Sequence, residues 1–117
     1  MISLNRTTLI GRVGNKPKIT LFENGDKIAQ FSLATNISRK NANGNFEQET
    51  EWHYISVYGK QIDAVERNVN KGDLLFVEGR NRTRKYLKDD IEIPVHEIVV
   101  YGYEGIVRVI SKKEVSN

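Results

Sequence analysis

Residues 74–101 read LLFVEGRNRTRKYLKDDIEIPVHEIVVY, and this stretch decides the fold. Its first four residues are all apolar, which is typical of a strand buried on both faces. A basic stretch, Arg80–Lys88, follows and ends at Asp89-Asp90, which indicates a turn. Ile91–Tyr101 then predicts a returning strand, in which Pro94 indicates an edge position or a bulge because proline cannot donate to a ladder. The stretch therefore predicts a long hairpin whose outgoing strand is basic.

Turn signals divide the rest of the chain into shorter strands and one helix. Asn24-Gly25 and Asn43-Gly44 are typical of hairpin turns. Apolar residues recur at helical spacing between residues 61 and 70, and Gly72 is the expected C-terminal cap. Several hairpins around one helix predict an all-β domain, built as a small closed or nearly closed barrel. The further strands expected are 4–13, 19–22, 29–38, 51–58 and 106–110.

Length and composition narrow the possible classes of protein. A chain of 117 residues fits one domain of ordinary size. It has no cysteine, which excludes disulfides and cysteine zinc sites. The opening MISLNRTTLIG has no long apolar segment, so we expect no signal peptide, and no apolar run approaches the ~18 residues of a membrane span. The net charge of +3 indicates a nucleic-acid partner only weakly, so the position of the charges matters more.

The basic stretch indicates the kind of partner more specifically when it is interpreted as a strand. Side chains alternate between the faces of a strand, and one face here would carry four cations and a tyrosine with no acid to neutralise them. Such a row suits a polyanion, although a solvated surface face explains it equally well. Its members are Arg80, Arg82, Arg84, Tyr86 and Lys88. Further cations that would extend this basic track are Arg6, Arg12, Arg39, Lys60 and Lys71.

A second strand, residues 51–58, places aromatic residues opposite an aliphatic face. Trp52, Tyr54 and Tyr58 share one parity, and aromatic rings on a polar face stack unpaired bases. The alternative is that these rings pack at a subunit interface or under a loop. An aromatic strand and a basic strand on the same small barrel together favour single-stranded nucleic acid.

The sequence gives little support for an enzyme. His53 lies on the aliphatic parity of its strand, which favours a core or interface histidine over a ligand. No spacing of His, Asp and Glu indicates a metal site, and no glycine-rich phosphate loop is present. We therefore expect no catalytic residues, no metal and no cofactor.

Five blocks, taken in order, resemble the bacterial-type single-stranded DNA-binding proteins and their mitochondrial relatives. The resemblance covers about residues 4–110 and implies an OB-fold: a five-stranded Greek-key barrel with one α-helix between strands and an extended β-hairpin arm. It also implies a homotetramer that binds single-stranded DNA in replication, recombination and repair. The blocks are LNRTTLIGRVG from Leu4, FSLATN from Phe31, TEWHYISVYGK from Thr50, KGDLLFVEG from Lys71 and RTRKY from Arg82.

The resemblance also implies roles for individual residues. The resemblance implies that bases stack on Trp52, Tyr58 and Tyr86, and that His53 lies in the subunit interface. The chain differs from the family at two base-stacking positions. Ser38 stands where the family often has a tryptophan, and Tyr86 stands where tryptophan is more usual. The cations implied to hold the DNA backbone are Arg6, Lys60, Lys71, Arg82, Arg84 and Lys85.

The end of the sequence departs from the bacterial family pattern. We expect an OB-fold domain at residues 1–110 and a short extension at 111–117 without the acidic tip that recruits partner enzymes. Tail-mediated recruitment of replication proteins is therefore not expected, nor is a membrane. The implied location is the cytoplasm or nucleoid of a bacterium, plasmid or phage host, with mitochondria as the alternative. Two other functions stay open: an RNA-binding or primosome-type OB-fold protein, and a protein-interaction scaffold.

Overall fold

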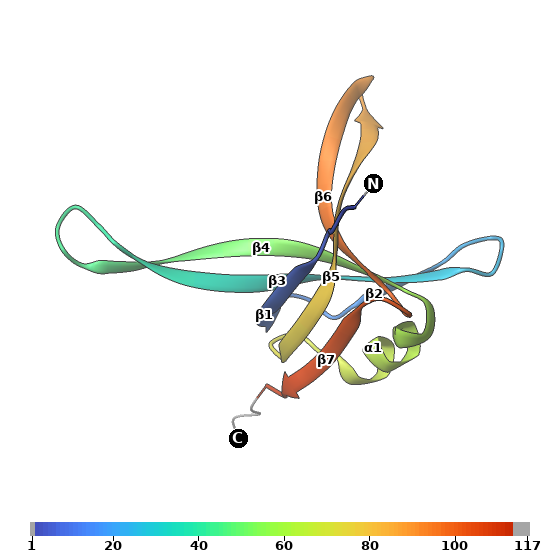
Figure 1. Ribbon diagram of the computed structural model, residues 1–117, viewed down its shortest axis with the longest axis horizontal. Helices are drawn as coiled ribbons and strands as arrows, with labels where there is room; N and C mark the ends of the chain where they lie inside the picture. The colour runs from blue at the N-terminus through green and yellow to red at the C-terminus, as the bar shows by residue number, and fades with distance from the viewer. Residues whose placement is uncertain (1, 114–117) are drawn as a thin grey trace.

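The computed structural model describes residues 2–113 and is drawn in Figure 1. Within this range seven strands accompany one short α-helix, which follows a single 3-10 turn at Gly59–Gln61. No helix in residues 2–113 is long and apolar enough to cross a membrane. The elements are β1 (Thr7–Val13), β2 (Lys18–Leu21), β3 (Lys27–Lys40), β4 (Phe46–Tyr58), α1 (Ile62–Asn68), β5 (Leu74–Lys88), β6 (Ile91–Tyr101) and β7 (Ile106–Ser111).

Five of the strands close into a barrel in the order β1, β3, β4, β6, β5, with β5 pairing back to β1. The barrel ladders are antiparallel except for the parallel pairing of β4 with β6. β2 pairs with β3, and β7 pairs with β5. The expected all-β OB-fold, with one helix between strands and a projecting hairpin arm, is confirmed.

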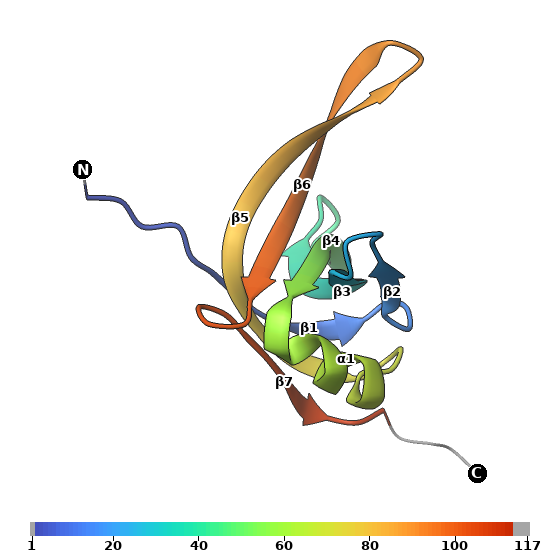
Figure 2. The same cartoon turned by 90° about the vertical axis from the view of Figure 1, so that its right-hand side faces the viewer.

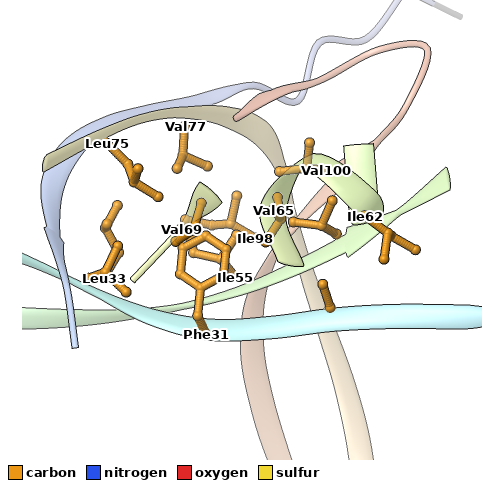
Figure 3. Close-up of a cluster of buried hydrophobic side chains, with 13 residues drawn as sticks. Phe31, Leu33, Ile55, Ile62, Val65, Val69, Leu75, Val77, Ile98 and Val100 are labelled. Carbon is orange, nitrogen blue, oxygen red and sulfur yellow. The ribbon is translucent and has the colours of Figure 1, made fainter. Parts of the chain in front are cut away.

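Alternate residues of the central strands fill the barrel. Phe31, Leu33, Ile55 and Val57 are at most 3% exposed, and Figure 3 shows three of them in the buried cluster. Each such burial contributes about 1.5–3 kcal/mol. Because side chains alternate along a strand, burial of this parity directs the intervening residues to the outside of the barrel.

Two long hairpins project from the barrel and separate from each other (Figures 1 and 2). The β3–β4 ladder extends out to Lys40 opposite Phe46, and the β5–β6 ladder extends out to Lys88 opposite Ile91. β4 and β6 pair only along the last residues of each strand, from Ile55 opposite Ile98 onward. Beyond that point, within the described residues, no backbone ladder joins the two hairpins.

The long hairpin matches its predicted bounds and turn. β6 is Ile91–Tyr101, and the turn residues Asp89 and Asp90 both have positive φ, 52° and 64°. Such angles suit the two-residue turn that joins strongly twisted antiparallel strands. Pro94 lies in the arm, where β6 has β5 as its partner in the ladder.

Three local predictions were wrong. Leu74–Val77 is not buried on both faces: Leu75 and Val77 are inside, whereas Leu74 and Phe76 are half-buried on the outside of the barrel. α1 ends at Asn68 with Val69 extended, so Gly72 is not its cap but a turn residue with φ 91°. β4 begins at Phe46 instead of residue 51, because the arm extends by backbone pairing and needs no buried face.

Candidate nucleic-acid interface

The ladder registers place the aromatic row of β4 and the basic row of β5 on one surface, the outer face of the barrel. Ser56 lies opposite Val99 in the β4–β6 ladder, and Arg82 lies opposite Glu97 in the β5–β6 ladder. Residues directly opposite each other point to the same face, and alternate residues along a strand share that face. The predicted site residues of β4 and β5 that this outer face brings together are Trp52, Tyr54, Tyr58, Arg80, Arg82, Arg84 and Tyr86.

Trp52 is 52% exposed and rests against the chain at Gly14. A Cβ on Gly14 would lie 2.5 Å from Cζ3 of the indole, so glycine is what allows the ring to lie this close to the backbone. Across the strands, Trp52 lies opposite Ala34, and Ala34 lies opposite Arg12. A cation and a half-exposed indole therefore occupy the same row of the outer face.

The tyrosines of the predicted site differ in how much ring they present. Tyr54 and Tyr86 are 59% and 44% exposed. Tyr58 is half-buried and stacks on Tyr101, with ring centroids 5.6 Å apart and planes at 25°. Tyr54 and Tyr86 are thus open platforms, whereas Tyr58 is part of an aromatic stack.

An acid from the neighbouring strand β6 lies beside the basic row, and the sequence of β5 alone does not reveal it. The Glu97 side chain is 3% exposed, and its Oε1 lies 3.6 Å from Arg82 Nε and 3.3 Å from Arg84 Nε. Its Oε2 accepts a hydrogen bond of 2.7 Å from the Ser56 hydroxyl. The prediction of a face without an acid was therefore wrong, because the neutralising carboxylate comes from the partner strand β6.

The contacts of Glu97 leave most of each arginine available. Both ion pairs use Nε, and the two side chains are 46% and 42% exposed. A guanidinium has five N–H donors, so its terminal nitrogens stay available to a phosphate. Glu97 is the residue of this face that the basic stretch alone does not reveal.

A hollow of about 420 Å³ lies between the aromatic and basic rows. Tyr54 lines it from β4, Arg84 from β5 and Glu97 from β6. Asn15 borders it and accepts hydrogen bonds from the Ser32 backbone N–H at 2.9 Å and the Ser32 hydroxyl at 2.7 Å. The outer face is therefore recessed where rings and guanidiniums meet.

The other predicted cations divide into those near this face and those away from it. Arg12 donates to the Gly72 carbonyl at 3.2 Å, next to the exposed Lys71. Arg39 and Lys85 point to the opposite face of their arms and pair with acids, Arg39 with Glu49 at 3.0 Å and Lys85 with Glu92 at 3.4 Å. The structure does not bring these two cations onto the outer face.

Two of the predicted cations, located where β1 begins beside the middle of β5, have acidic neighbours. Arg6 lies 3.7 Å from Glu78, and Arg80 lies 3.9 Å from Glu104. Exposed pairs of this kind contribute about 0–1 kcal/mol, so a phosphate competes with them readily.

His53 lies on the inner parity of β4, as its spacing predicted. Its Nε2 is 2.9 Å from the Thr35 hydroxyl, and the ring is half-buried. Within residues 2–113, no group of three or more His, Asp and Glu side chains is placed to hold a metal ion.

Known proteins resemble this chain in sequence and in fold. The chain is 39% identical over 99 residues to the single-stranded DNA-binding protein of Neisseria meningitidis serogroup A, covering 84% of this chain and 57% of the relative. It is 37% identical over 83 residues to single-stranded DNA-binding protein 1 of Chlorobaculum tepidum, covering 71% and 51%. The chain therefore spans about half the length of these relatives.

A solved structure titled as the Plasmodium falciparum SSB complex with ssDNA superposes with a TM-score of 0.87 at 36% identity, covering 95% of this chain and 98% of that one. The sequence model described as the single-strand binding protein family matches residues 4–104. Sequence and fold agree, and this chain belongs to the single-strand binding protein family.

Proposed function

We propose that this chain binds single-stranded DNA without sequence preference and protects it during replication, recombination and repair. The observation that carries the proposal is the register that places the β4 rings and the β5 guanidiniums on one outer face. The names of the relatives support it, as does the solved complex with single-stranded DNA.

In the proposed mechanism, electrostatic capture precedes stacking. Arg82 and Arg84 take phosphates with the nitrogens that Glu97 leaves available, and release the counterions condensed on the strand. Unpaired bases then stack on Trp52 and the exposed tyrosines, which accept any base because each has a ring face. Duplex DNA binds weakly because its bases are already stacked on each other. The role is binding without chemistry.

We propose that the DNA-binding unit is residues 1–110 and that it acts as a homotetramer, with His53 in the subunit interface. β7 runs to Ser111, and residues 114–117 of the expected extension lie outside the described residues. The two relatives named above are bacterial proteins, which supports a place with DNA in the cytoplasm or nucleoid.

The test is a titration with oligo-dT, followed by the fluorescence of Trp52, the single tryptophan of the chain. We expect quenching on binding, an affinity that falls as salt rises, and an affinity about 1–3 kcal/mol weaker when Trp52→Ala is measured by a labelled oligonucleotide. Duplex of equal length should compete poorly. A salt slope near zero contradicts the electrostatic step, and stronger competition by RNA than by DNA favours the RNA-binding alternative.

A further inference from the structure

Three tyrosines form a continuous stack at the end of the outer face. Tyr58 stacks on Tyr101 as described, and Tyr101 stacks on Tyr103 with ring centroids 6.0 Å apart and planes at 24°. Tyr103 is 83% exposed. The stack begins on β4, passes through the last residue of β6 and ends on a ring open to solvent.

The turn that carries Tyr103 is held in place by hydrogen bonds on both sides. Within the turn, the N–H groups of Glu104 and Gly105 both donate to the Tyr101 carbonyl, at 3.1 and 2.8 Å. Gln61 donates to the Gly105 carbonyl at 2.7 Å and accepts from the Val107 N–H at 2.8 Å. Tyr103 therefore projects from a fixed turn.

Two basic residues adjoin the turn that carries the stack. A Cβ on Gly102 would come within 2.9 Å of the Lys60 backbone nitrogen, so Lys60 adjoins the chain between Tyr101 and Tyr103. Arg80 reaches the same turn through its 3.9 Å contact with Glu104. The surroundings of the stack thus repeat the combination of rings and cations found on the rest of the outer face.

We propose that Tyr103, backed by Tyr101 and Tyr58, is an additional base-stacking subsite for single-stranded DNA, with Lys60 and Arg80 as its phosphate contacts. The proposal rests on the proposed function of the outer face and extends its path from β4 across the β6–β7 turn. Tyr58 and Tyr101 are half-buried among other side chains, so packing within the protein explains their presence. The ring of Tyr103 is exposed to water, so packing does not explain it. A base that stacks on this ring covers the exposed apolar surface and continues a stack that is already formed.

The subsite is tested with oligo-dT of increasing length, from about 4 to about 16 nucleotides, the range of site sizes for one OB-fold. We expect Tyr103→Ala and Tyr103→Leu to bind the longer oligonucleotides about fivefold more weakly or worse, and Tyr103→Phe to bind like the unmodified chain. The difference should disappear for oligonucleotides too short to reach the turn from Trp52. Phe46→Ala is the matched control, because Phe46 is 75% exposed at the tip of the β3–β4 arm.

The outcomes separate the subsite from the function. If the unmodified chain binds oligo-dT and Tyr103→Leu binds equally well at every length, the subsite is refuted and the proposed function stands. An equal loss in Phe46→Ala also refutes the subsite, because any exposed ring would then matter. If the unmodified chain does not bind oligo-dT at all, the proposed function itself fails.

Discussion

Glu97 is the residue on which the basic row depends. It is buried, and its contacts with the two arginines and Ser56 place a single negative charge beneath two cations. A buried carboxylate without a partner loses solvation that nothing replaces. We therefore infer two roles for Arg82 and Arg84: the proposed contact with DNA, and a contribution to the stability of the fold.

This double role makes a prediction about stability. We expect Arg82→Gln with Arg84→Gln to lower the free energy of unfolding by about 1–3 kcal/mol, because Glu97 is left buried without a cation. Either substitution alone should have a smaller effect, since the other arginine still contacts the carboxylate. Urea denaturation measures the difference.

Adding Glu97→Gln to the double variant is the matched control. It removes the buried charge, so we expect stability to recover while DNA binding stays weak. A double variant as stable as the unmodified chain would show that the ion pairs do not matter for the fold.

At the scale of the element, the end of β7 is fastened by a buried aspartate. The Asp73 side chain is 2% exposed and accepts hydrogen bonds from Lys112 Nζ at 2.6 Å, the Lys113 N–H at 3.0 Å and the Asn70 N–H at 2.8 Å. Burial raises the pKa of this carboxyl, but the three hydrogen bonds and the charge of Lys112 outweigh burial and lower it below its usual range. The ionised form is thus favoured in the folded chain.

The lowered pKa predicts how stability depends on pH. A group with a lower pKa in the folded state stabilises the fold fully above its unfolded pKa, about 3.9 for aspartate, and this stabilisation is lost as the pH falls through the folded value. We expect Asp73→Asn to be about 1–3 kcal/mol less stable than the unmodified chain at pH 7. The gap should narrow below pH ~4.

Denaturation over a pH series measures this gap, with Glu23→Gln as the control because Glu23 is an exposed acid in a turn. A gap that stays constant down to pH ~2 would contradict the role given to the ionised form.

The strands of the barrel could be predicted because their alternation reflects burial. Phe31, Leu33, Ile55 and Val57 show the period of two because each one enters the core. The length of the β3–β4 arm could not be predicted. The residues between Trp52 and the tip of the arm pair through the backbone and bury no side chain. The run Leu74–Val77 does not alternate in sequence, because its outer residues are also apolar and are half-covered on the outside of the barrel.

The candidate site was predictable in its residues but not in its contacts. The aromatic and basic rows follow from parity, whereas their shared face depends on a parallel pairing of β4 with β6 that sequence spacing does not show. Glu97 could have been found, because a two-residue turn at Asp89-Asp90 fixes the register and places residue 97 opposite Arg82. The stack that ends at Tyr103 depends on a turn outside any periodic pattern.

At the scale of the whole molecule, the net charge of +3 is modest, so a general field does not explain binding to a polyanion. The local arrangement matters instead: cations on β5 and rings on β4 share one recessed face, while Arg39 and Lys85 point away from it. We propose that single-stranded DNA lies along this outer face and contacts both rows.

Photocrosslinking tests that claim most directly. Oligo-dT with bromodeoxyuridine at single positions is irradiated in complex with the unmodified chain, and the crosslinked residues are identified by mass spectrometry. We expect crosslinks at Trp52 on β4 and at Tyr86 on β5, within one complex of defined length. Crosslinks confined to the opposite face of the arms or to β7, with none at Trp52 or Tyr86, would contradict it.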